Sequence, residues 1–273
     1  MIRPFFEAFF AIVFLVWGRW YADTNLQSEL YGMTIGLCAA LIIEFATWLY
    51  HERNFLKLYW RCYIYYHKPE LRLSIAYIYS IEVQGKYLLV KSNRISNTYQ
   101  PVGGVYKYFH PEASLELKNM NAIPDNAITN DDVSENDLRL KLRNRKNIRK
   151  FLKWFFSESC REWDAWREFY EELVDTGILP EQEFKYIHYE LVGQHFEPIH
   201  YDEHFKIDTF KYTDVLTPKF INERQKNELR MLLNQNNSEF IWVTEEEIMR
   251  KVSDDGKRIA DHSYKIFHNK KLK

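Results

Sequence analysis

The feature that most constrains this chain is an apolar run close to its N-terminus. Residues Tyr31 to Tyr50 contain a single charged side chain, Glu44. An α-helix rises 1.5 Å per residue, so this run is long enough to cross a hydrocarbon core about 30 Å thick. The run therefore predicts a membrane-spanning helix.

A second apolar run, Phe5 to Ala22, precedes the first and is interrupted by Glu7 and Arg19. A cleaved signal peptide would explain this run alone, but no small-x-small cleavage site accompanies it and the next run follows closely. We therefore expect residues 1–50 to form a two-helix transmembrane hairpin, followed by a juxtamembrane linker over residues 51–70. Basic residues are frequent after the second run and sparse in the connecting loop, which predicts a two-pass protein with both termini in the cytoplasm.

Glu44 lies inside the second run, where an ionisable side chain is costly and is a functional candidate by default. If several hairpins associate as a homo-oligomer, a ring of Glu44 side chains would admit water among the membrane lipid. The alternative is a protonated or hydrogen-bonded carboxyl within the hairpin, supported by Thr47. Gly32 and Gly36 form a GxxxG pair that favours close helix packing.

A cluster of carboxylates marks the second half of the chain. In the segment REFYEEL, which starts at Arg167, Glu168, Glu171 and Glu172 are spaced at i, i+3 and i+4 and would share one helical face. Ionised carboxylates on one face repel one another unless a cation lies among them, and Mg²⁺ prefers oxygen ligands. The spacing therefore indicates a magnesium site, with a solvated glutamate face as the alternative.

The helix that carries these glutamates has sequence signals at both ends. Ser159 and Glu162 match a capping box, which predicts a helix that begins near Cys160. Gly177 is expected to end it.

The REFYEEL segment resembles the core of the Nudix box, the motif of hydrolases that act on nucleoside diphosphates linked to another moiety. Upstream, the segment YQPVGGV at 99–105 resembles the Pro-x-Gly-Gly strand and turn that precedes the box. The resemblance implies that the three glutamates hold Mg²⁺, that Glu171 or Glu172 serves as catalytic base, and that Arg167 orients them. It also implies that Gly103 and Gly104 form the backbone turn beside the metal. A further Glu precedes the arginine in the standard box, at the position that Ser159 occupies here.

The remaining pattern predicts an α+β fold: two N-terminal transmembrane helices followed by a Nudix-like α/β/α sandwich over residues 71–273, with an insertion at about 109–137. Strand-like runs occur at 73–83, 87–91, 99–108, 184–196 and 204–213, and Phe240 to Val243 reads as a late strand that enters a helix capped at Thr244.

A basic row is expected on one of these strands. The leucines at 138, 140 and 142 alternate with Arg139, Lys141 and Arg143, so one face would be buried and the other basic. Beside the expected nucleotide site, these three residues and Arg167 are candidate phosphate-binding residues, with a solvated face as the alternative.

Overall composition adds two constraints. The net charge is −1, which argues against a strongly charged partner such as a nucleic acid polymer, and the three cysteines have no disulfide-like spacing, which fits a reducing compartment.

The combination of an N-terminal membrane hairpin with a Nudix domain resembles the membrane effectors of bacterial CBASS antiphage systems, the SMODS-associated Nudix family. This resemblance implies location in the bacterial inner membrane, a cyclic oligonucleotide as ligand, and hairpins that assemble and damage the membrane. The alternative is a membrane-tethered, Mg²⁺-dependent Nudix pyrophosphohydrolase.

Overall fold

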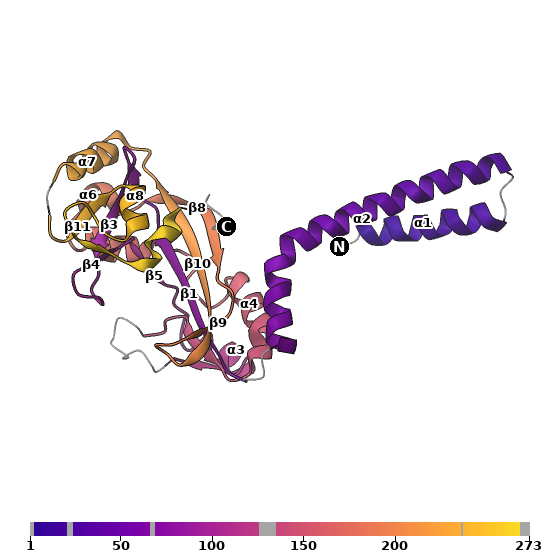
Figure 1. Ribbon diagram of the computed structural model, residues 1–273, viewed down its shortest axis with the longest axis horizontal. Coiled ribbons are helices and arrows are strands. Elements are labelled where there is room, and N and C mark those ends of the chain that lie inside the picture. The colour runs from indigo at the N-terminus through magenta and orange to yellow at the C-terminus, as the bar shows by residue number, and fades with distance from the viewer. Residues whose placement is uncertain (1–2, 21–23, 66–68, 126–134, 236, 268–273) are drawn as a thin grey trace. The chain divides into compact units, whose positions relative to one another are not determined.

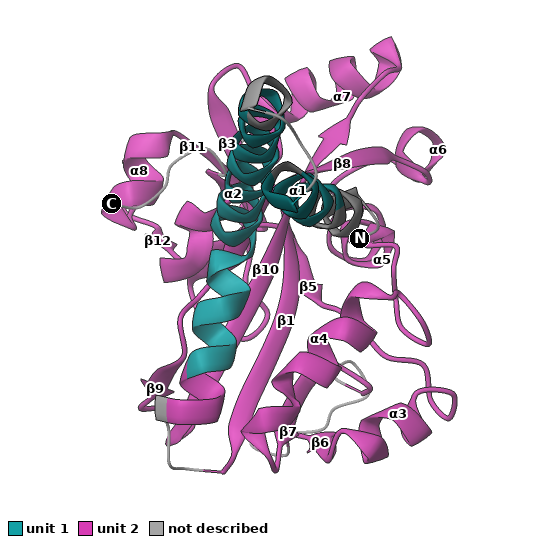
Figure 2. Cartoon of the chain, turned by 90° about the vertical axis from the view of Figure 1, so that its right-hand side faces the viewer, with its two compact units in different colours: residues 1–60 teal, residues 61–273 magenta. Residues whose placement is uncertain are grey.

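A computed structural model describes residues 3–20, 24–65, 69–125, 135–235 and 237–267 of the 273-residue chain (Figure 1). The chain divides into two compact units, residues 1–60 and residues 61–273 (Figure 2).

The first unit consists of two helices, α1 (Arg3–Trp20) and α2 (Thr24–Trp60), which pack along one another (Figure 1). Ala11 of α1 and Leu30 and Thr34 of α2 are buried, whereas most of the apolar run in α2 is exposed. The helical stretch Ser28–Ile64 is long and apolar enough to cross a membrane, and its most apolar window is only 6% buried inside the protein. Low burial separates this helix from the core helix of a soluble protein, which would be mostly buried.

The prediction of two membrane helices is corrected to one candidate span. Among the described residues, Ser28–Ile64 is the only helix that meets the length and hydropathy criterion. The 18 residues of α1 include Arg3, Glu7 and Arg19, and three charges in so short a helix lower its suitability for the bilayer. The expected linker at 51–70 contains the end of α2 and the π-helical turn η1 (Arg61–Tyr65).

The second unit is built around a mixed sheet with the strand order β6-β7-β1-β10-β8. Its central strands, β1 (Leu71–Tyr79) and β10 (Ile207–Lys219), are parallel. The strands that flank this pair are antiparallel to it: β7 (Arg139–Leu142) and β5 (Gly103–Val105) on β1, β8 (His188–Phe196) and β9 (His200–Asp202) on β10. β6 (Ala122–Pro124) extends the sheet beyond β7.

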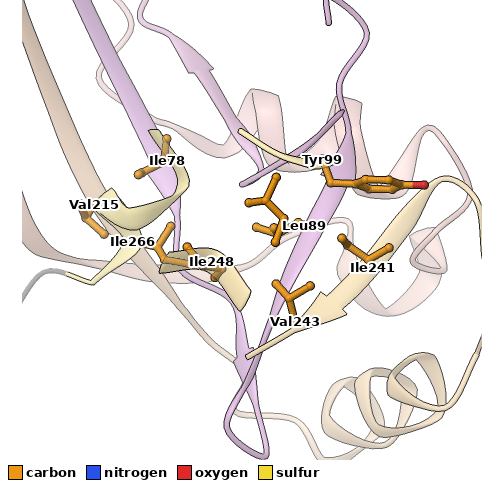
Figure 3. Close-up of a cluster of buried hydrophobic side chains, with 9 residues drawn as sticks. Ile78, Leu89, Tyr99, Val215, Ile241, Val243, Ile248 and Ile266 are labelled. Carbon is orange, nitrogen blue, oxygen red and sulfur yellow. The ribbon is translucent and has the colours of Figure 1, made fainter. Parts of the chain in front are cut away.

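A smaller sheet has the order β11-β3-β4-β12, with β2 paired to β3. Its strands are β2 (Glu82–Val83), β3 (Lys86–Lys91), β4 (Thr98–Gln100), β11 (Phe240–Val243) and β12 (Arg258–Ile259). Buried side chains of this sheet, such as Leu89 and Val243, form one apolar cluster with Ile78 of β1 and Val215 of β10 (Figure 3). The cluster joins the two sheets, because burial of apolar surface favours their contact.

A helix packs on the large sheet through aromatic side chains. α4 (Ile148–Phe156) packs the ring of Phe155 against Tyr106 and Tyr212. The other helices of this unit are α3 (Ser114–Asn119), η2 (Arg145–Asn147), α5 (Trp166–Phe169), η3 (Tyr170–Val174), α6 (Glu181–Phe184), α7 (Glu223–Leu233), α8 (Glu245–Arg250) and η4 (Asp261–Ile266). The structure therefore confirms a mixed α+β fold.

The segment predicted as an insertion, residues 109–137, contains α3 and β6. Its middle, residues 126–134, lies outside the described residues.

Candidate functional site: the glutamate helix and its cavity

The helix of the REFYEEL segment begins later than the sequence predicts. α5 starts at Trp166, and the Trp166 N–H donates to Oδ1 of Asp164 at 3.0 Å. The capping box predicted from Ser159 and Glu162 is wrong, because Cys160 adopts a left-handed backbone with φ +57° and its carbonyl accepts from Phe109 N–H. This long-range pairing replaces the first turn of the predicted helix.

Arg167 is the centre of the site, and all five of its N–H groups have acceptors. Nε and Nη2 donate to the two oxygens of Glu162 at 3.0 and 3.3 Å. Nη1 donates to Glu168 at 2.7 Å and to Glu171 at 3.1 Å, and Nη2 also donates to the Val105 carbonyl at 3.2 Å. Arg167 therefore orients carboxylates, and an anionic ligand would have to displace one of them to bind it.

Glu162 was predicted to belong to a helix cap, but the structure places its carboxylate beside Arg167. Its carboxylate, 10% exposed, accepts from the Lys107 backbone N–H at 3.0 Å as well as from Arg167. Glu162 therefore pairs with Arg167, whereas the hydroxyl of Ser159, at the position where the standard box has a glutamate, contacts Cys160. The closeness of Glu162 to Arg167 in the sequence could have indicated that the two side chains pair. The contact itself depends on the non-helical path of the chain from Cys160 to Ala165.

The glutamates do not lie on a regular α-helical face. After Phe169 the helix becomes π-helical, and the Asp175 N–H donates to the Tyr170 carbonyl five residues earlier at 2.8 Å. Such π segments frequently occur at functional sites. The side chain of Glu171 is 48% exposed. Glu172 is instead held by the protein, since its Oε2 accepts from the Gly103 N–H at 2.9 Å.

Burial dominates the electrostatics of Glu172. Burial and, to a smaller extent, the charges of Glu168 and Glu171 raise the pKa of this carboxyl to about 8, although the N–H of Gly103 opposes the shift. A carboxyl with this pKa carries a proton near neutral pH unless a cation compensates its charge.

The two glycines of β5 make room for the glutamates. They pair with β1, Gly103 with Ile78 and Gly104 with Tyr77. A Cβ on Gly104 would lie 1.9 Å from Oε1 of Glu168, so this carboxylate packs directly on the backbone. The glycines predicted to form a turn therefore belong to a strand.

A cavity of about 950 Å³ adjoins the glutamates. Its acidic wall includes Glu168, Glu171, Glu172 and Asp137, and its floor includes Ser74 and Ala76 of β1. Cationic side chains from four separate segments also line it, namely Lys91, Arg94, Arg139, Lys211 and Lys265. The cavity therefore offers both signs of charge to a ligand.

The profile of the SMODS-associated NUDIX domain matches residues 70–267, which is most of the chain. The chain belongs to the SMODS-associated NUDIX domain family. No curated protein and no solved structure matches it significantly. The match confirms the predicted Nudix family, and the REFYEEL and YQPVGGV segments both lie within the matched range.

NUDIX domains generally use divalent metals, and the donor types of this SMODS-associated NUDIX domain fit Mg²⁺. One oxygen each of Glu168, Glu171 and Glu172 is held by Arg167 or Gly103, and the other oxygen has no hydrogen-bond donor among the described residues. No three acidic, histidine or cysteine side chains in the described part of the chain converge as a ready-made cation site. Metal binding and catalysis by these glutamates remain predictions.

The predicted phosphate-binding residues of the NUDIX domain are separated. Arg139 lines the cavity and pairs with Asp137 at 2.7 Å, while Lys141 and Arg143 are not among the lining residues. Lys91, Arg94 and Lys211 were missed, since no spacing in the sequence links them. In the first unit, the Thr47 hydroxyl donates to the Ile43 carbonyl at 2.7 Å rather than to Glu44, whose functional role stays a prediction.

Proposed function

We propose that this protein is a membrane effector of cyclic-nucleotide antiphage immunity, in which the NUDIX domain senses a cyclic oligonucleotide and the apolar helix α2 assembles and disrupts the bacterial inner membrane. The family match supports a role alongside a cyclic-nucleotide synthase. The long apolar helix on the same chain supports membrane attachment and localisation.

The observation that carries the sensing function is the cavity. About 950 Å³ suits a nucleotide-sized ligand, and cationic residues from separate segments line it together with hydrogen-bonding groups. Arg167 meanwhile holds Glu168 and Glu171 as a structural cluster. Because Arg167 already holds these two carboxylates, the arrangement favours binding of a ligand over its hydrolysis.

The test is ligand binding followed by assembly. Full-length protein in detergent micelles is titrated by calorimetry with cyclic di- and trinucleotides, and its mass is measured before and after addition. We expect binding, a shift to a higher oligomer by mass action between weak helix contacts, and dye release from liposomes that contain the protein. If no cyclic di- or trinucleotide binds, the sensing function is wrong.

Membrane disruption is tested separately at Glu44. Glu44→Gln is expected to reduce dye release while binding of the cyclic nucleotide is unchanged, because the residue lies in the apolar run of α2. Glu52→Gln, in the same helix beyond that run, is the matched control. Equal leakage by the wild type and Glu44→Gln would remove Glu44 from the process.

The second candidate function is Mg²⁺-dependent hydrolysis of nucleoside diphosphate derivatives. It is favoured by the three glutamates that line the cavity, each with one oxygen that accepts from no donor in the described part of the chain. These side chains would hold the metal, which would polarise a phosphoryl oxygen, and Glu171 or Glu172 would accept a proton from the attacking water. If Glu171→Gln and Glu172→Gln leave turnover of a panel of nucleoside diphosphate sugars unchanged, this candidate is excluded.

A further inference from the structure

Two cationic side chains lie on either side of Ser74, a small residue that lines the cavity. In the register of the large sheet, Ser74 of β1 pairs with Arg139 of β7 on one side and with Lys211 of β10 on the other. Residues in register across a sheet project to the same face, and all three line the cavity. The next row brings Ala76 opposite Thr213, so the floor between the cations is made of small side chains.

The spacing of the two cations follows from the sheet. Neighbouring strands lie about 5 Å apart, so the two inter-strand spacings from β7 across β1 to β10 separate the Arg139 and Lys211 backbones by about 10 Å. Lys211 pairs at 3.2 Å with Asp202 of β9, which lies on the edge of β10 opposite β1. Arg139 pairs with Asp137, which lies two residues before the start of β7. Each side chain is therefore held on its own side of Ser74.

Arg139 is the less satisfied cation. Its guanidinium is 16% exposed, and Asp137 accepts the one hydrogen bond that it donates within the described part of the chain. Burial lowers the pKa of Arg139, Asp137 opposes this, and the charge of Arg94 lowers it further. A buried guanidinium with spare donors beside a second arginine favours an anionic ligand, and phosphate suits its fork geometry.

We propose that Arg139 and Lys211 each bind a different phosphoryl group of one ligand, so the cavity selects molecules whose two phosphates are separated by a sugar or a ring. Glu168 packs on Gly104 of β5, which pairs with β1 on the same edge as β7, whereas β10 pairs with the other edge. The Arg139 position is therefore on the glutamate side and Lys211 is on the far side. Because Asp137 and Asp202 hold the two side chains on opposite sides of Ser74, two phosphates joined through one oxygen are expected to occupy one position at a time. The inference rests on the proposed sensing function and defines its ligand class.

The experiment measures affinity by calorimetry on the full chain in detergent. The probes with two or more separated phosphates are cyclic di-AMP, cyclic di-GMP and cyclic tri-AMP. The comparison probes are 3′,5′-cyclic AMP, with one phosphate, and inorganic pyrophosphate, with two adjacent phosphates. We expect at least one probe of the first set to bind, and both comparison probes to bind about 100-fold more weakly or not at all.

Variants then test the two positions with the probe that binds. A charge-assisted hydrogen bond contributes about 1.5–3 kcal/mol, so Arg139→Gln and Lys211→Gln should each weaken binding about 10- to 100-fold. Arg224→Gln and Lys219→Gln, an arginine and a lysine outside the cavity lining, should leave affinity unchanged. Asp137→Asn combined with Arg139→Gln removes both members of that ion pair and should weaken binding equally without leaving a buried charge.

The outcomes separate this inference from the proposed function. If a cyclic nucleotide binds the wild type and Lys211→Gln with equal affinity, or if pyrophosphate binds as tightly, the two-point inference is overturned while sensing stands. If no cyclic nucleotide binds the wild-type chain, the sensing function fails first and this inference fails with it.

Discussion

Glu162 and Arg167 form the ion pair on which the geometry of the site depends. Arg167 contacts Glu162, Glu168 and Glu171 at once, and Glu162 also ties the backbone of Lys107 into the cluster. Removing Glu162 leaves a largely buried guanidinium with two lost acceptors, a change that is typically strongly destabilising.

We therefore expect Glu162→Gln to lower the free energy of unfolding by about 2–3 kcal/mol, measured by urea denaturation. Ser159→Ala is the matched control, because Ser159 is exposed and its hydroxyl contacts only Cys160 among the described residues. It should change stability by less than about 0.5 kcal/mol. A larger loss for Ser159→Ala than for Glu162→Gln would reverse the assignment.

His262 gives the second prediction at this scale. Burial and, to a smaller extent, the positive charge of Lys265 lower its pKa to about 4, although the carboxylates of Asp261 and Glu197 oppose the shift. The imidazole is thus neutral in the folded protein and titrates near 6.5 in the unfolded chain. Its contribution to stability is fully present above pH 6.5 and is lost as the pH falls toward 4.

Unfolding measured at pH 7, 6 and 5 should show a decrease in stability that approaches, for this single proton, about 1.4 kcal/mol per pH unit below 6.5. His262→Gln should flatten the decrease over this range. His204→Gln, at an exposed loop histidine, should keep the wild-type slope. An unchanged slope for His262→Gln would show that other groups carry the acid sensitivity.

The two glycines of strand β5 both lie very close to neighbouring atoms, but the atoms differ in kind. Gly103 has φ +150°, and a Cβ there would lie 2.3 Å from the Tyr77 carbonyl oxygen and 2.7 Å from Ile78 Cα, both backbone atoms. At Gly104 the added Cβ meets the flexible carboxylate of Glu168 instead. The two adjacent glycines therefore make a matched pair with different consequences.

Gly103→Ala is expected to cost several kcal/mol or to prevent folding, because the backbone of β1 cannot move aside without breaking the sheet. Gly104→Ala is expected to fold and to move the Glu168 side chain, with a smaller loss. Thermal unfolding ranks the two variants. A greater loss for Gly104→Ala would contradict the pairing of β5 with β1.

At the scale of the whole molecule, the division between the two units falls at residue 60 and leaves η1 with the NUDIX domain. Cys62 of η1 is 1% exposed. Nη1 of Arg61 donates to the Ile199 carbonyl at 3.4 Å. The domain thus extends N-terminal of β1.

A fragment of residues 61–273 should therefore unfold at a higher temperature than a fragment of residues 71–273, by about 2–4 °C for each kcal/mol of lost packing. Differential scanning fluorimetry of the two fragments measures the difference. Cys62→Ser in the longer fragment should reproduce part of it. Equal melting temperatures would show that η1 belongs to the helical unit.

The sequence by itself determined the features that depend on neighbouring residues. The apolar run of α2 follows from composition alone. The alternation over residues 138–142 buries Leu138, Leu140 and Leu142 as predicted. The capping box of α8 is confirmed, since Thr244 and Glu247 bond reciprocally across one turn. Each of these involves contacts within a few residues, where spacing fixes geometry.

Only the tertiary structure decided the site. The same capping pattern at Ser159 and Glu162 does not form a cap. The Glu162 carboxylate instead accepts from Arg167 and from the backbone N–H of Lys107. The backbone of residues 160–161 pairs with residues 108–109. The parallel pairing of β1 with β10, more than a hundred residues apart, places Lys211 beside Ser74. Long-range strand register and competition between partners determine which charges meet, and neither is encoded in local spacing.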